Sequence, residues 1–178
     1  MKWGHGEIDT FVGDIWELAT QAIVVPIHTD LRPAGTIGVE VRKRLGPSVE
    51  KQLTVKSDLT LGQICVTSAG TLACESVIHI AVTTLSTKPT IEILQEALSN
   101  SLLHAFHTAM RSVAIPAMFN NPGELTTSAV AHTTVKAAMD HLQKGKHPGR
   151  IVMVVPTDYV LKAFETEMNR VSDGRLLT

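Results

Sequence analysis

Residues 21–27 read QAIVVPI, and this short apolar run decides the fold. It is rich in β-branched residues and lacks polar alternation, which is typical of a strand buried on both faces of a parallel or mixed sheet. Similar runs recur along the chain between glycine, proline, serine or charged residues. They are QICVT at 63–67, SVIHIAV at 76–82, SVAIPA at 112–117 and RIVMVV at 150–155.

Apolar residues with helical spacing lie between these runs. They recur every three or four positions within residues 37–45, 91–102, 126–142 and 159–168. This alternation predicts an α/β fold with a mixed, mostly parallel sheet between two layers of helices. Ligands of such folds bind at the carboxyl ends of strands, near the point where the strand order reverses. We therefore expect the function to lie in the loops that follow the strands.

Composition and charge restrict the classes of function. The chain has 178 residues, 44% of them hydrophobic, and its 16 Lys and Arg balance 17 Asp and Glu. This size predicts one domain over residues 1–178. Because the charges balance, no net field favours nucleic acid or anionic lipid as a partner. Residues 1–9 lack the apolar centre of a signal peptide and no apolar run reaches about 18 residues, so we expect a cytoplasmic protein without a membrane partner.

The cysteines and histidines indicate neither a disulfide framework nor a metal site. Cys65 and Cys74 are too few for a framework and lack CxxC spacing, so we predict two small core residues. His104 and His107 share a predicted helix, but no carboxylate or thiol nearby in sequence completes a zinc set. We predict no metal and no cofactor, and we expect surface positions for His79, His104, His107, His132, His141 and His147.

Five landmarks follow one another in a characteristic order. Gly13-Asp14-Ile15 precedes the 21–27 run, and PAGTIGVEVRKRLG at 33–46 combines a small-residue loop with a helix. The others are LGQ at 61–63, TSAG at 67–70 followed by VIH at 77–79, and VAIPA at 113–117 followed by SAVA at 128–131. This succession resembles the macro domain, a module that binds ADP-ribose. The resemblance covers about residues 13–142 and implies a three-layer α/β/α fold.

The resemblance implies that ADP-ribose or a related adenine nucleotide is the ligand and that Asp14 and Ile15 contact its adenine. A carboxylate can accept a hydrogen bond from the exocyclic amine of adenine, which suits Asp14. The alternative is that Asp14 caps a helix that begins near Trp16.

The glycine-rich loop of the family holds phosphates through backbone N–H groups at the start of a helix. The resemblance assigns this role to Gly35, Thr36, Ile37 and Gly38. Pro33, Ala34 and Thr36 stand where the family usually has glycine or another small residue, so a close approach of the phosphates is reduced but not abolished.

The first strand of the family usually ends in NAAN, and this chain has Val25, Pro26, Ile27 and His28 there. Both amides are missing, and Pro26 has no backbone N–H. His28 can replace the second amide as a hydrogen-bond donor, or act as a base near neutral pH. It is therefore the candidate catalytic residue. The alternative is an ordinary polar residue at the end of a strand.

The second phosphate loop of the family, GTGxxG, corresponds to residues 119–124, FNNPGE. The resemblance implies ligand contacts for Phe119, Asn120, Asn121 and Gly123. Asn120 and Asn121 can adopt left-handed backbone conformations and donate from their amides, and Phe119 can stack on a ribose or base. The alternative is a plain NNPG turn.

Three functions remain open. The first is binding of ADP-ribose or a related adenine nucleotide. The second is hydrolysis of ADP-ribosyl esters or O-acetyl-ADP-ribose with His28 as the water-positioning residue. The third is a degenerate macro fold that serves as a scaffold or binds another ligand, which the apolar residues Val25 and Ile27 would permit.

Overall fold

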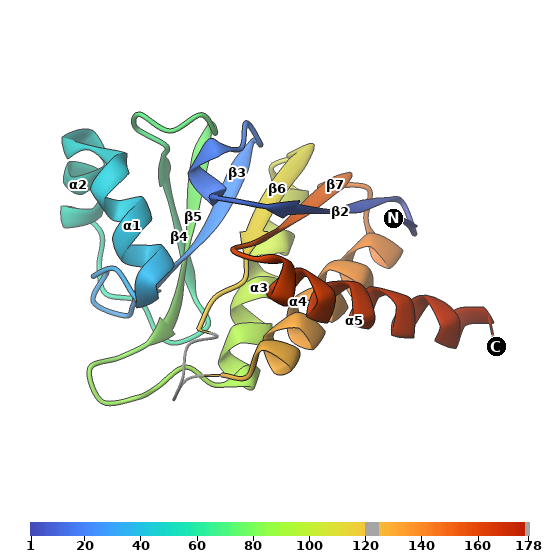
Figure 1. Cartoon of the computed structure of the whole chain (residues 1–178). Coiled ribbons are helices and arrows are strands. Elements are labelled where there is room, and N and C mark those ends of the chain that lie inside the picture. Colours follow the sequence, from blue (N-terminus) through green and yellow to red (C-terminus); the bar gives the residue numbers. More distant parts are fainter. Residues whose placement is uncertain (120–124, 177–178) are drawn as a thin grey trace.

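The computed structural model describes residues 1–119 and 125–176. Its central sheet has seven strands in the order β1-β2-β7-β6-β3-β5-β4, covered by helices on both faces (Figure 1). Along the chain the elements are β1 Lys2–Trp3, β2 Gly6–Val12, the 3-10 helix η1 Ile15–Glu17, β3 Ala22–His28, α1 Gly35–Leu45, α2 Pro47–Thr54, β4 Ile64–Ser68, β5 Ser76–Thr83, α3 Ile91–His107, β6 Ser112–Pro116, α4 Thr127–Lys144, β7 Arg150–Val155 and α5 Asp158–Leu176.

The sheet is mixed and mostly parallel, as predicted. Strands β2, β7, β6, β3 and β5 run parallel to their neighbours, whereas β1 pairs antiparallel with β2 and β4 with β5. The parallel strands therefore end at a common edge of the sheet, which is where this architecture places ligands.

Strand β3 contributes to two apolar layers, one on each face of the sheet. Val24 packs in the layer that includes residues of α3, α4 and α5. Ile23, Val25 and Ile27 pack in the other, with residues of α1 and α2. Since both faces are covered, the apolar run of β3 needs no polar alternation. The predicted helix layers on both faces are confirmed (Figure 1).

Elements β1, β2 and α2 were not predicted from the sequence. Strand β2, GEIDTFV, buries only Ile8 fully, because its other residues are partly or wholly exposed. The strand is held in the sheet by parallel pairing with β7, in six register pairs that begin with Glu7 and Arg150. Helix α2 has eight residues and buries Val49 and Leu53. A two-residue strand, a half-exposed strand and an eight-residue helix contain too few apolar repeats for a local pattern to identify them.

Helix α1 lies very close to β3 because position 38 is glycine. A Cβ atom on Gly38 would stand 2.5 Å from the carbonyl oxygen of Pro26. The N–H of Ala34 donates to that same oxygen at 3.2 Å. These contacts place the start of α1 against β3 near the edge where the parallel strands end.

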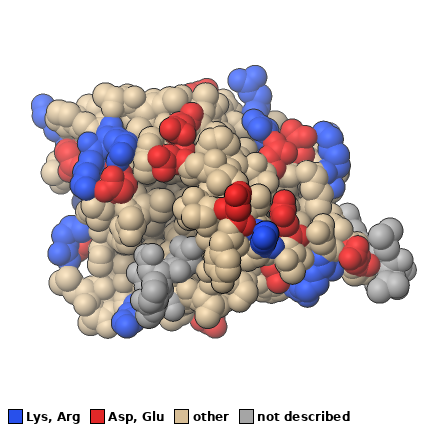
Figure 2. Space-filling model, viewed as in Figure 1, with Lys and Arg blue, Asp and Glu red and all other residues tan. Residues whose placement is uncertain are grey.

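The described residues also settle two smaller points. Cys65 and Cys74 are buried and free, which confirms the prediction of two core thiols. Each helix in the described ranges is too short or too polar to cross a bilayer. Figure 2 shows acidic and basic side chains interspersed over the face in view, which accords with the balanced net charge.

Candidate ligand-binding cleft

A crevice opens between the carboxyl ends of β3 and β6. The two strands form register pairs only at Ala22 with Val113 and Ile23 with Ala114. Further along β3, the carbonyl of Pro26 accepts a hydrogen bond from the N–H of Ala34, which precedes α1, and not from a residue of β6. Strand β3 leads to α1 on one face of the sheet and β6 leads to α4 on the other, so the crevice lies at a topological switch point.

The narrower part of the crevice is a cavity of about 160 Å³ at the start of α1. Here the Gly38 N–H bonds to the Ala34 carbonyl, while the N–H groups of Gly35, Thr36 and Ile37 precede the first helical hydrogen bond. Ala34 offers no capping side chain, and the first turn has no acidic residue. Such a helix start attracts anions. The lining residues are Pro26, Gly35, Thr36, Ile37, Ala117, Met118, Phe119 and Pro156.

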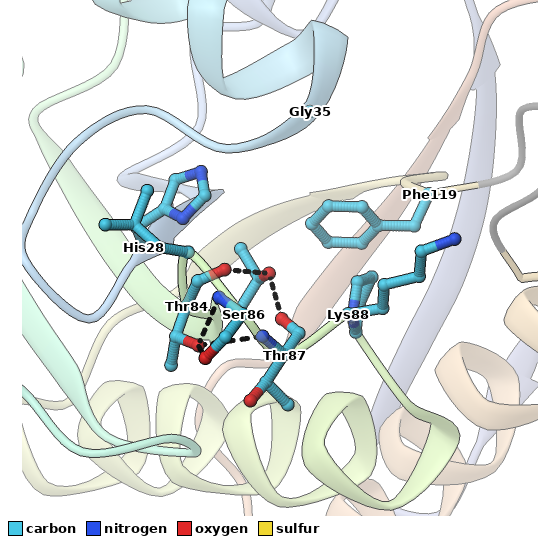
Figure 3. Close-up of a pocket in the computed structure, with 10 residues that line it drawn as sticks. His28, Gly35, Thr84, Ser86, Thr87, Lys88 and Phe119 are labelled. Carbon is cyan, nitrogen blue, oxygen red and sulfur yellow. Dashed lines mark hydrogen bonds between the residues drawn. The ribbon is translucent and has the colours of Figure 1, made fainter.

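The wider part is a cavity of about 610 Å³ between His28, Phe119 and residues 83–89, which are the last residue of β5 and the loop that leads on to α3 (Figure 3). Thr84 orders this loop, because its Oγ1 accepts hydrogen bonds from the N–H groups of Ser86 and Thr87 at 3.2 and 2.9 Å. This side of the wider cavity is lined by the hydroxyl-bearing residues Thr83, Thr84, Ser86 and Thr87. Lys88 is the one Lys or Arg among the described residues that line the two cavities.

His28 ends β3 and lines the wider cavity. Its N–H donates to the carbonyl of Arg32 at 2.8 Å, and its carbonyl accepts from Leu31 at 2.9 Å. The Nδ1 atom of the imidazole is buried without a hydrogen-bond partner in the described structure. Figure 3 shows the imidazole on the opposite side of the cavity from Phe119. His28 is thus placed to meet a ligand in this cavity.

Phe119 lines both cavities, as does Gly35. The residue is 5% exposed and its backbone has a φ of 58°, which is unusual for a bulky side chain. Its ring lies on Gly35, with a ring carbon 3.1 Å from the place where a Cβ atom of Gly35 would stand. Gly35 itself has a φ of 62°. The aromatic ring therefore closes on the first residue of α1.

The remaining predicted site residues lie in different surroundings. Asp14 is exposed and stands at the N-cap position of η1, as the capping interpretation expects, but its side chain makes no capping hydrogen bond. Ile15 is buried in the layer with α1 and α2. Neither residue lines the two cavities. Asn120, Asn121 and Gly123 fall outside the described residues.

Sequence reasoning missed the loop of residues 83–89 and Pro156, both of which line the crevice. The available indication was general, because each follows the carboxyl end of a parallel strand. Neither carries a motif that distinguishes it from an ordinary turn.

The expected surface position of His79 is wrong. Its side chain is 1% exposed, and burial lowers its pKa to about 3, with the positive charges of Arg42 and Lys56 acting in the same direction. One buried histidine does not make a metal site by itself. No group of three or more His, Cys, Asp or Glu side chains within 1–119 and 125–176 is arranged to hold a metal ion.

The fold agrees with what comparison with known proteins shows. The Macro domain family model matches residues 24–134, more than half of the chain. This chain therefore belongs to the Macro domain family. Its likeness to the macrodomain of Oceanobacillus iheyensis with ADP has a TM-score of 0.88 at 17% identity and covers 98% of this chain and 96% of that one.

Curated relatives are distant in sequence. An uncharacterized protein of Mycobacterium tuberculosis is 28% identical over 170 residues, which cover 94% of this chain but 46% of the relative. The chain thus spans less than half the length of this relative. The O-acetyl-ADP-ribose deacetylase of Salmonella typhimurium is 26% identical over 148 residues, which cover 80% of this chain and 83% of the enzyme.

Proposed function

We propose that this macro domain binds ADP-ribose or a related adenine nucleotide in the crevice between β3 and β6. One observation carries the proposal: the amides of Gly35, Thr36 and Ile37 start a helix beside a cavity, with no capping side chain and no acidic residue in the first turn. A diphosphate is the part of the ligand that such amides hold.

The two cavities suggest how the ligand lies. The diphosphate occupies the narrower cavity at the start of α1, and the terminal ribose occupies the wider cavity near His28 and the hydroxyl groups of residues 83–87. The adenine extends toward Asp14, whose exposed carboxylate is free of a cap bond. The ADP in the O. iheyensis macrodomain and the substrate name of the S. typhimurium deacetylase support this class of ligand.

Calorimetric titration with ADP-ribose tests the proposal. The Thr36→Glu variant tests in addition whether the diphosphate lies at the start of α1. Thr36 is exposed in the first turn of α1 and lines the narrower cavity. A carboxylate there stabilises the helix through its dipole by about 0.3–1 kcal/mol but repels a diphosphate. We therefore expect a more stable protein that binds at least about tenfold more weakly, a loss of roughly 1.4 kcal/mol.

The matched control is Val39→Glu, which adds the same charge to α1 at a position 39% exposed that lines neither cavity. It should bind like the unmodified protein. Equal affinities of the Thr36→Glu and Val39→Glu proteins would place the anion elsewhere. No heat with ADP-ribose, ADP or NAD at high protein concentration would remove the proposal altogether.

A second candidate function is hydrolysis of an ADP-ribosyl ester or of O-acetyl-ADP-ribose. It is favoured by His28, whose buried Nδ1 lacks a partner at the edge of the cavity assigned to the terminal ribose. In this role the imidazole holds the attacking water beside the ribose.

Turnover of O-acetyl-ADP-ribose by the unmodified and His28→Ala proteins tests this role. We expect loss of most of the rate, about 10²-fold or more, as is typical of general acid–base groups. His132→Ala, which changes an exposed histidine outside both cavities, is the control. Equal rates in the unmodified and His28→Ala proteins exclude His28 as the catalytic residue.

A further inference from the structure

We propose that Phe119 is a specificity gate that favours adenosine diphosphates without a second sugar over ADP-ribose. The inference rests on the proposed function and deepens it. It concerns how a ligand passes from the cavity at the start of α1 to the wider cavity near His28, since Phe119 lines both.

The contact between Phe119 and Gly35 is close and apolar. Three ring carbons of Phe119, Cε1, Cδ1 and Cζ, lie 3.1, 3.5 and 3.9 Å from the place of a Cβ atom on Gly35. Outside Gly35, its chain neighbours and the nearby backbone of α1, these ring carbons are the described heavy atoms nearest to that place. Since Gly35 belongs to both linings, a chain of atoms that joins the two cavities along α1 has to pass this contact. The ring offers it no hydrogen bond.

The backbone holds the ring in this position. The carbonyl of Phe119 accepts a hydrogen bond from Leu125 at 2.8 Å, and the N–H of Ala117 donates to Val154 at 2.8 Å. At the same time the φ of 58° is an uncommon conformation for phenylalanine, so the closed position stores conformational strain. Strained residues of this kind cluster at ligand clamps and switch regions, and here movement of the ring would join the cavities.

The two kinds of ligand should therefore respond differently to the gate. ADP needs only the narrower cavity and the adenine side of the crevice, so it binds whether or not the ring moves. ADP-ribose carries a second ribose that needs the wider cavity and so binds only the open form. Its apparent affinity is reduced by the fraction of molecules that are open.

The experiment compares ADP and ADP-ribose by calorimetry for the unmodified protein, Phe119→Ala and Phe119→Gly. Glycine accommodates the positive φ at this position and provides a folded variant if alanine strains the backbone. Phe106→Ala removes a second phenylalanine ring, 40% exposed on α3 and outside both cavities, as the matched control. Thermal melting verifies that each variant is folded.

We expect ADP-ribose to bind the two Phe119 variants about tenfold more tightly, as for a form that is open a tenth of the time, and the affinity for ADP to change less than about twofold. Phe106→Ala should change neither affinity. Unchanged or weaker binding of ADP-ribose to both Phe119 variants, with ADP still bound, would overturn the gate and leave the proposed function standing. Binding of neither ligand to any of the proteins would overturn the proposed function itself.

Discussion

The Nε2 atom of His79 lies 2.9 Å from the Oγ1 atom of Thr67. Both side chains are buried, and the Nδ1 atom of His79 has no partner in the described structure. Burial, together with the positive charges of Arg42 and Lys56, lowers the pKa of His79 to about 3. The imidazole is therefore neutral in the folded protein at every pH at which the protein is expected to work.

This neutral histidine predicts a loss of stability in mild acid. In the unfolded chain the pKa of His79 returns to about 6.5, so the unfolded state binds more protons than the folded state between pH 3 and 6.5. Stability therefore falls as the pH is lowered below 6.5, by about 1.4 kcal/mol per unit as an order of magnitude. Urea unfolding between pH 5 and pH 7 measures the slope.

His79→Gln serves as the comparison, since a glutamine keeps a hydrogen-bonding group but does not titrate. We expect a flatter dependence of its unfolding free energy on pH. The carboxylates of Glu40, Glu50 and Glu167 have lowered pKa values and also contribute to the loss of stability in acid, mainly near and below their ordinary value of 4.5. They are present in both proteins, so the difference between the two slopes isolates the histidine. Equal slopes for both proteins would show that His79 is not the titrating group.

The interior position of His79 can be inferred from the sequence. In SVIHIAV a period of two places His79 on the same face of the strand as Val77 and Ala81. Since a strand of this kind is covered on both faces, the histidine lies inside the protein. The five apolar runs located β3 to β7 for the same reason, whereas β2 depends on pairing with β7, which no local pattern reveals.

Backbone properties near the crevice show in the sequence only at the glycines. Gly35 and Gly38 indicated a close approach at the start of α1, and the structure packs the ring of Phe119 and the carbonyl oxygen of Pro26 against these two positions. The positive φ of Phe119 is invisible in a phenylalanine, because such a conformation is imposed by tertiary contacts. The loop of residues 83–89 is ordered by threonine hydroxyls whose bonds depend on its path, so its role in the cavity was not predictable.

We expect the Arg42 side chain to contribute to the unfolding free energy through its hydrogen bonds. It bonds to both carboxylate oxygens of Glu50 and, through Nη1, to the carbonyl of Leu31 at 2.9 Å. The ammonium group of a lysine cannot reproduce this planar arrangement of hydrogen bonds. We expect Arg42→Lys to lose about 1–3 kcal/mol of unfolding free energy in urea. Lys136→Met, which breaks an exposed pair with Asp140, should lose less than about 1 kcal/mol. Equal losses would contradict the special role of Arg42.

Gly38 links stability to the shape of the crevice. A Cβ atom there would clash with the backbone carbonyl of Pro26 at 2.5 Å, so α1 has to move away from β3. We expect Gly38→Ala to cost about 2–3 kcal/mol, the upper range for a strained core substitution, and to weaken binding of ADP as well. Gly174→Ala in α5, where nothing lies within 4 Å, should instead stabilise by up to about 1 kcal/mol. Thermal melting of the Gly38→Ala and Gly174→Ala proteins measures the two effects. A Gly38→Ala protein that is as stable as the unmodified protein and binds ADP equally well would show that α1 does not need glycine at position 38.

Because of Asp14, we expect the crevice to prefer adenine over hypoxanthine. Its exposed carboxylate makes no cap bond, so it is free to accept from the 6-amino group of adenine, while the 6-keto group of hypoxanthine would face it as a second acceptor. We expect ADP to bind about tenfold more tightly than inosine diphosphate, as for one hydrogen bond to a charged group. In Asp14→Asn the amide can also donate, so the preference should largely disappear, whereas Asp173→Asn on α5 should keep it. If Asp14→Asn and the unmodified protein discriminate equally in calorimetry, the adenine lies away from Asp14.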